Sequence, residues 1–187
     1  MISQAMDRRV FLASAAAVTA AGLMIGSRAL AAAANELPPM TLPPPIGAAE
    51  KQARVRAAQA MMQKAGIGAI IIEPGASLDY YTGVQWWRSE RLTAAVIPAS
   101  GDAIVVTPFF EKPSVAESLA IQAEIRTWNE DEEPLKLVAQ FLRERGVDSS
   151  PIAFEETNRF WIMDRLKQQL PNVRIVSANP IVRAQRM

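Results

Sequence analysis

From Ala48 onward, segments with helical periodicity alternate with short apolar runs, and this alternation restricts the possible folds more than any other feature of the chain. In the first segment, Val55, Ala58 and Met62 fall on one helical face, whereas residues 67–73 are almost continuously apolar. A continuous apolar run is typical of a strand that is buried on both faces. Helices placed between such strands favour an α/β layered domain.

The same patterns predict the order of the elements. Helices are expected in residues 48–66, 111–123, 130–146 and 157–171, with a short helical turn in 74–83 that Ser77 can cap. Strands are expected in residues 67–73, 124–128, 151–155 and 173–178, and as a hairpin in 91–108 around the turn 99–102. We therefore predict a single three-layer α/β domain, in which a mixed, mostly parallel sheet of five to six strands carries helices on both faces.

The N-terminus has the order of a secretory signal. Arg8 and Arg9 precede an apolar run in residues 10–25, and small residues follow it. The paired arginines resemble the twin-arginine type of signal. We expect residues 1–31 to be cleaved after the Ala-x-Ala pattern at 29–31, although neighbouring alanines offer other sites. Cleavage would leave no stable membrane anchor and a periplasmic or secreted protein, and the alternative is an uncleaved N-terminal anchor.

A proline-rich linker is expected to follow the signal, in residues 32–46. Five prolines between Asn35 and Ile46 favour extended, polyproline-like backbone without a packed core. The alternative is a proline-rich ligand for a partner. The folded domain is then expected in residues 47–187.

Two missing residue types restrict the chemistry. The sequence contains neither histidine nor cysteine, which excludes disulfides, imidazole and thiolate zinc sites, and Ser-His or Cys-His nucleophiles. Acid–base catalysis would fall to a carboxylate, a lysine or a tyrosine. The net charge of +1 changes to about −1 without residues 1–31, so the composition offers no basic field for nucleic acid. We expect no catalytic residue and no metal ligand in this chain.

Two stretches carry a resemblance to a known family. Residues 78–111 include a Tyr-x-Thr-Gly-like turn at Tyr80–Gly83, and residues 152–187 end in Val182–Met187. Together with the first helix and strand, these stretches resemble the N-terminal domain of the creatinase, prolidase and Xaa-Pro aminopeptidase superfamily. In that family a run that opens like Val182–Met187 crosses into the catalytic domain.

The resemblance implies a non-catalytic domain. In the resembled family, two Asp, one His and two Glu hold two metal ions (Mn, Zn or Co) in a pita-bread catalytic domain, which we expect to be absent here. The turn signal Asn179-Pro180 is followed by no predicted closing helix or strand, so we expect an interrupted end. The family's N-domains pack near the partner's active site, which implies a homodimer or a catalytic peptidase domain as partner.

The stretch WWRSER provides the candidate site residues. Trp86 and Trp87 point to opposite faces if the backbone is extended. One interpretation is a core tryptophan beside a surface one, with Arg88 and Arg91 as solvated charges. The other is a loop that presents Trp86, Trp87, Arg88 and Arg91 to a neighbouring subunit, as an interface or a substrate gate.

Other polar features have structural interpretations. Tyr80, Tyr81 and Gly83 are expected to shape a turn and fill the core. The acidic run in 129–134 is expected to complement a helix dipole, with a hard-cation site as the alternative. Adjacent Glu155 and Glu156 suggest a carboxylate pair, but neighbouring side chains diverge on a strand.

Three hypotheses about function follow. The first is an exported, non-catalytic N-terminal domain of a Xaa-Pro peptidase-like metallohydrolase that serves assembly or substrate gating. The second is a stand-alone periplasmic domain that binds a small molecule or a peptide. The third is an inactive, truncated gene product.

Overall fold

The computed structural model describes residues 42–187. Arg8, Arg9, the expected signal and most of the expected linker lie outside these residues. The helices are α2 (Ala48–Ala65), α3 (Ala76–Thr82), α4 (Lys112–Ser118), α5 (Pro134–Glu144), α6 (Phe160–Gln169) and α7 (Asn179–Arg186), with a 3₁₀ turn, η1 (Phe109–Glu111). The strands are β1 (Ala69–Ile72), β2 (Ala94–Pro98), β3 (Ala103–Pro108), β4 (Ala123–Trp128), β5 (Ile152–Phe154) and β6 (Ile175–Ser177).

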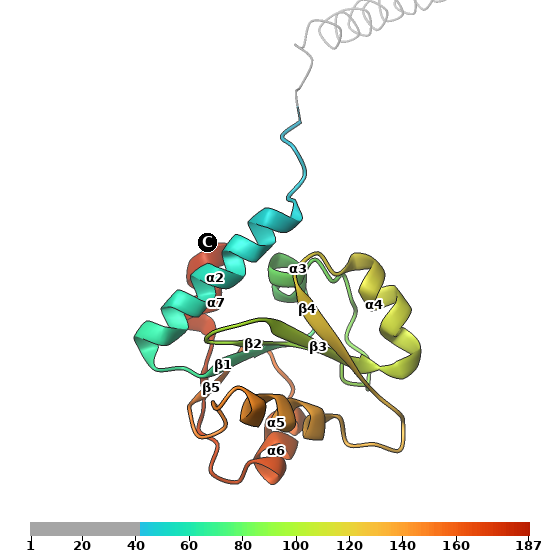
Figure 1. Cartoon of the computed structure of the whole chain (residues 1–187), viewed down its shortest axis with the longest axis vertical. Coiled ribbons are helices and arrows are strands. Elements are labelled where there is room, and N and C mark those ends of the chain that lie inside the picture. The colour runs from blue at the N-terminus through green and yellow to red at the C-terminus, as the bar shows by residue number, and fades with distance from the viewer. Residues whose placement is uncertain (1–41) are drawn as a thin grey trace, which may run out of the picture. The chain divides into compact units, whose positions relative to one another are not determined.

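The six strands form one mixed sheet in the order β4-β3-β2-β1-β5-β6. β1, β5 and β6 pair in parallel, as do β3 and β4, whereas β2 runs antiparallel to both of its neighbours. Helices α2, α3, α4 and α7 cover one face and α5 and α6 the other (Figure 1). The predicted fold class, a three-layer α/β domain with a mixed and mostly parallel sheet, is confirmed.

Alternation along the strands builds a core on each face of the sheet. In β1, Ala69 and Ile71 pack with the α5 and α6 side, whereas Ile70 and Ile72 pack with the α2 side. Successive strand side chains point to opposite faces, so a strand between two helical layers needs apolar residues at every position. This explains the uninterrupted apolar run that marks β1 in the sequence.

The end of the chain differs from the expectation. Residues that were expected to follow a turn without further structure form α7, with Pro180 in its first turn and Ile181 and Val182 buried. Proline is tolerated there, because the first N–H groups of a helix have no partner within the helix. The two apolar side chains pack on the α2 side of the sheet, which supplies the tertiary contacts that a short helix needs.

Two smaller expectations also need correction. α4 ends at Ser118, five residues earlier than predicted. Ser77 lies inside α3 and does not cap it, because Gly75 occupies the position before the helix. The hydroxyl of Ser77 instead donates a hydrogen bond to Glu155 (2.5 Å), which joins α3 to the end of β5.

Candidate functional site

The carboxyl ends of the five parallel strands lie at one edge of the sheet, and β2 begins there. The connections that leave or enter this carboxyl edge are residues 73–75, 83–93, 109–111, 129–133 and 155–159. In open α/β sheets, ligands bind in crevices outside the carboxyl ends of the strands. This edge is therefore where a site is expected.

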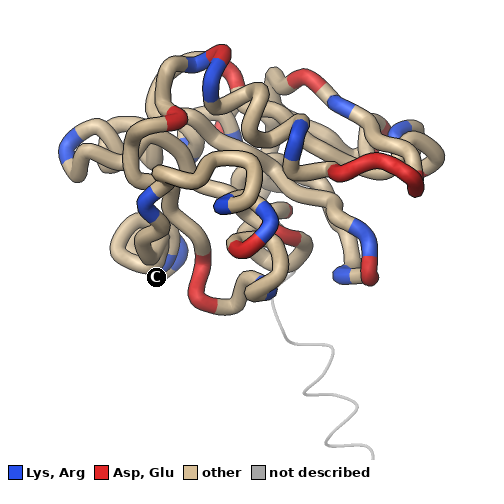
Figure 2. The backbone as a smooth tube through the Cα atoms, turned by 90° about the horizontal axis from the view of Figure 1, so that it is seen from below, with Lys and Arg blue, Asp and Glu red and all other residues tan. Residues whose placement is uncertain are grey.

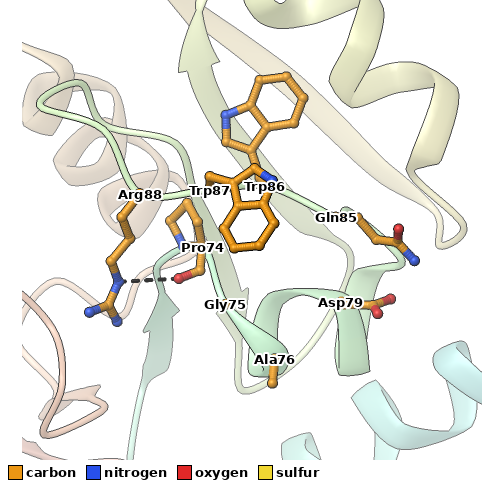
Figure 3. A pocket seen from close by; sticks show the side chains of 8 residues that line it. All are labelled: Pro74, Gly75, Ala76, Asp79, Gln85, Trp86, Trp87 and Arg88. Atoms are coloured by element: carbon orange, nitrogen blue, oxygen red, sulfur yellow. Dashed lines mark hydrogen bonds between the residues drawn. The ribbon is translucent and has the colours of Figure 1, made fainter.

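An open groove lies at this edge beside the start of α3. It has a volume of about 650 Å³ and is lined by Pro74, Gly75, the α3 residues Ala76 and Asp79, and the segment 85–88. Figure 3 shows the two indoles between Gln85 and Arg88, with the Arg88 side chain directed at the Pro74 carbonyl. The walls thus combine two indoles and small apolar residues with the polar side chains of Asp79, Gln85 and Arg88.

The two tryptophans differ in their surroundings. Trp86 is half-buried and packs against the core on the α2 side. Trp87 is 90% exposed, and it is one of the large apolar side chains that the described residues leave in solvent. Exposure of so large a ring carries no benefit for folding, so Trp87 is available for contact with another molecule.

Arg88 holds its segment to two other connections. Its Nε donates to the Pro74 carbonyl (3.2 Å), and its Nη atoms donate to the Thr157 carbonyl (3.0 Å) and hydroxyl (3.3 Å). All three acceptors are neutral, and within residues 42–187 the guanidinium forms no ion pair. Two of its five N–H groups are left for another acceptor.

A buried ion pair, which the sequence did not indicate, lies directly beneath this segment. The Glu73 side chain is fully buried, and it accepts hydrogen bonds from the Arg159 Nε (2.7 Å) and backbone N–H (2.8 Å). The remaining nitrogens of Arg159 donate to the carbonyls of Ser89 and Arg91. Glu73 follows β1 and Arg159 precedes α6, so the pair joins connections that are far apart in sequence.

Arg91 extends the site toward β4. It pairs with Glu130 and Glu90, and its guanidinium lies 5.5 Å from the ring centroid of Phe110. The hydrogen bond that Arg91 donates to Glu130 raises the pKa of Arg91 above its usual value. Arg91 is charged at neutral pH.

A second polar cluster fixes α7 against α3. The hydroxyls of Tyr80 and Tyr81 both donate to Gln185, to its carbonyl and side-chain oxygen respectively. Burial, followed by the neighbouring Tyr80, raises the pKa of Tyr81 well above its usual value. The tyrosines thus fill the core and fasten α7, and Gly83 ends α3 in the left-handed conformation.

Most of the acidic residues singled out in the sequence have structural partners. Glu130 binds Arg91, Glu132 accepts from the Asn129 N–H, and Glu133 caps α5. Glu155 and Glu156 diverge to different serines, Ser77 and Ser177. Among the described residues no three acidic side chains converge as metal ligands would. Figure 2 shows the longest acidic run at 130–133, and charges of both signs interspersed elsewhere.

Three further exposed aromatic residues lie at the same edge. Phe109, Phe110 and Phe160 are 64%, 54% and 77% exposed, at the ends of the β3 and β5 connections. Sequence reasoning missed them, because Phe109 and Phe110 follow a buried strand and Phe160 opens a helix with an apolar face. Their exposure becomes evident only when the strands are placed side by side in the sheet.

None of the helices in residues 42–187 has both the length and the apolar character that a membrane span requires.

Comparison with known proteins places most of the chain in one family. Residues 54–187 match the model of the creatinase/prolidase N-terminal domain. The probable dipeptidase PepE of Mycobacterium tuberculosis is 35% identical over 91 residues, which is 48% of this chain and 24% of that protein. The same identity and coverage hold for the protein from Mycobacterium bovis. The chain therefore spans about a quarter of the length of these curated relatives.

Solved structures agree with this match. The dipeptidase PepE from Mycobacterium ulcerans superimposes with a TM-score of 0.65 and 31% identity, over 75% of this chain and 37% of that one. The creatinase/prolidase N-terminal domain of an X-Pro dipeptidase from Streptococcus pyogenes gives a TM-score of 0.62 at 15% identity. That comparison covers 71% of this chain and 98% of the Streptococcus domain, and it shows the likeness of fold.

Proposed function

Because the chain belongs to the creatinase/prolidase N-terminal domain family, we propose that it is the non-catalytic N-terminal domain of an exported Xaa-Pro dipeptidase-like metallohydrolase. In this proposal its carboxyl edge packs beside the substrate pocket of a catalytic domain, in the same assembly or in a homodimer. Trp87 then covers part of that pocket. Export rests on Arg8 and Arg9 and on the apolar run that follows them.

The observation that carries the proposal is the exposure of Trp87 on a segment held at several points. Burying an aromatic ring removes on the order of 200 Å² from water, which gives an upper limit of about 5 kcal/mol at 25 cal/mol per Å² before the costs of association are subtracted. Arg88 and Arg159 fasten the neighbouring backbone, so little conformational freedom is lost when Trp87 is covered. Large, preorganised aromatic residues are favoured as anchors of interfaces.

The groove has a chemistry that suits a peptide end. Its indoles can exclude water from a neighbouring reaction, and the two N–H groups that Arg88 retains can donate to a carboxylate. In this arrangement Trp87 covers the substrate and Arg88 orients its charged end.

The described residues do not fit the paired metal ions of the family. They include no histidine, no three of their acidic side chains converge, and the carboxylates at the carboxyl edge, such as Glu130, Glu155 and Glu156, are bound by arginine or serine. No step of metal-assisted hydrolysis is assigned to this chain. The proposed role is limited to contact with a catalytic domain and its substrate.

A chimera tests the proposal. Residues 48–187 would replace the corresponding domain of the Mycobacterium ulcerans dipeptidase, and hydrolysis of a Xaa-Pro dipeptide would be measured. Trp87→Ala is expected to lower kcat/KM by about 10- to 100-fold, because a contact at the covered pocket is lost. Its melting temperature should change little, since Trp87 is exposed.

Two controls accompany this measurement. Lys64→Ala removes an exposed side chain at the C-terminal end of α2, before β1, and should leave turnover unchanged. The isolated chain should release no amino acid. Wild-type turnover in the Trp87→Ala chimera would contradict the proposal.

The groove itself favours a second candidate function. Its volume of about 650 Å³ lies within the range of small-molecule sites, so the domain could bind a peptide or a small molecule without a catalytic partner. A thermal shift of the isolated chain on addition of a Xaa-Pro dipeptide, abolished by Trp86→Ala, would favour this alternative.

A further inference from the structure

We infer that Glu73 and Arg159 act as a positioning pair for the segment that presents Trp87. The inference rests on the proposed function, because it assigns a role in how Trp87 is held. Neither residue lines the groove, and both lie on connections other than the one that carries the tryptophans.

The segment between Val84 and Leu92 needs support from outside. It has no helix or strand, and it passes from the core on one face of the sheet to the core on the other. Both end residues are buried, but residues 87–90 are exposed. Apolar packing therefore fixes the two ends of the segment and leaves its middle to polar contacts.

Arg159 supplies the contacts at the middle. Its two Nη atoms donate to the carbonyls of Ser89 and Arg91, which flank the turn before β2. These are backbone acceptors, so the contacts depend on the path of the segment and not on its side chains. A single guanidinium thus connects two points of the segment to the start of α6.

Glu73 determines the orientation of the Arg159 guanidinium. Each carboxylate oxygen accepts from a different group of Arg159, one from Nε (2.7 Å) and one from the backbone N–H (2.8 Å). Nη2 of Arg159 also lies 2.7 Å from a carboxylate oxygen of Glu73, so the pair fixes the plane of the guanidinium, whose Nη atoms reach the segment. Because the Glu73 side chain is fully buried, its charge is costly without this partner.

Arg88 makes the reciprocal connection. It reaches from the segment to Thr157, two residues before Arg159, and to the Pro74 carbonyl, next to Glu73. Together, Arg88, Arg159, Glu73 and Thr157 connect the ends of β1 and β5 with the segment beside Trp87. The position of the exposed indole therefore depends on a buried charge pair.

Limited proteolysis of the full chain tests this inference directly. Trypsin cleaves after arginine, and Arg88 and Arg91 both lie in the segment, so cleavage at these two bonds reports its release. Glu73→Gln and Arg159→Lys are expected to raise the initial rate of cleavage after Arg88 and Arg91 by at least about fivefold, since local opening controls access. The products would be quantified by mass spectrometry over the first few per cent of digestion.

A matched variant separates positioning from general loosening. Arg165→Lys changes an arginine inside α6 that also pairs with a carboxylate, Glu133, but donates no hydrogen bond to residues 84–92. It should leave the two cleavage rates at their wild-type values. Combining Glu73→Gln with Arg159→Lys should add little to either single change, because the two residues act as one unit.

Two outcomes would overturn the inference. One is wild-type cleavage after Arg88 and Arg91 in both single variants. The other is cleavage that rises equally at arginines throughout the domain, which would assign the pair to general stability. Neither readout uses peptide turnover, so a failed Trp87→Ala chimera would refute the proposed function and leave this result to be judged separately.

Discussion

Gly83 combines a left-handed backbone with close packing against neighbouring backbone. It ends α3 with φ of 85°, and a Cβ there would lie 2.8 Å from both the Ser118 carbonyl oxygen and the Ala120 Cβ. The Ala120 N–H also donates to the Thr82 carbonyl, so the chain after α4 cannot easily withdraw. Left-handed backbone and close approach thus act at the same position.

Replacement of Gly83 by alanine should therefore destabilise the fold by two additive effects. Left-handed backbone costs a non-glycine residue about 1–2 kcal/mol, and overpacking costs about 1–3 kcal/mol more. Gly66→Ala is the matched control, because Gly66 has φ of 65° but no atom within 4 Å of its Cβ position. We expect urea titration to give a loss of unfolding free energy about 1–3 kcal/mol larger for Gly83→Ala. Equal losses in the two variants would show that the close approach of Ser118 and Ala120 to Gly83 contributes nothing to the loss of stability.

The candidate site shows what a sequence can and cannot indicate about single residues. WWRSER was identifiable because adjacent tryptophans cannot both enter one core, and the structure indeed leaves Trp87 exposed. Glu73 and Arg159 could not be identified, because 86 positions separate them and nothing in their local sequence distinguishes them from surface charges. Their relation depends on β1 and β5 being neighbours, which is a property of the sheet order.

At the scale of elements, periodicity predicted the strands and most helices. Apolar runs, short alternating segments and the hairpin turn predicted all six strands. β1, β2, β3 and β5 are buried throughout, whereas β4 and β6 are only partly buried. The order β4-β3-β2-β1-β5-β6 could not be derived, since many arrangements bury the same strands equally well. The missed helix, α7, has a turn signal at its start and only two buried residues, so its stability depends on tertiary contact.

A substitution in α7 tests that contact. Val182 is fully buried in the cluster on the α2 side of the sheet, so Val182→Ala should lower the free energy of unfolding by about 2 kcal/mol. Arg183→Ala, an exposed neighbour on the same helix, should change it by less than about 0.5 kcal/mol. Denaturant titration of both variants checks the difference. Equally small effects would mean that α7 is not docked as the structure shows.

At the scale of the whole molecule, both cores are complete within residues 45–187. The sheet is covered on each face by helices of the same unit, and the sequence contains no cysteine that would require oxidation after export. A domain of this kind can fold before it crosses a membrane. This property agrees with the twin-arginine route that we propose, because that route carries folded proteins.

The paired arginines should determine the route of export. Changing Arg8 and Arg9 together to lysine keeps the charge of the N-terminus but removes the twin-arginine pattern, so we expect uncleaved protein to accumulate in the bacterial cytoplasm. Arg28→Lys, which also preserves charge but lies outside the pair, should be processed as the wild type is. The measurement is the ratio of precursor to mature protein in cytoplasmic and periplasmic fractions. Normal processing of the double variant would indicate the general secretory route, in which the chain crosses unfolded and the early completion of both cores has no bearing on export.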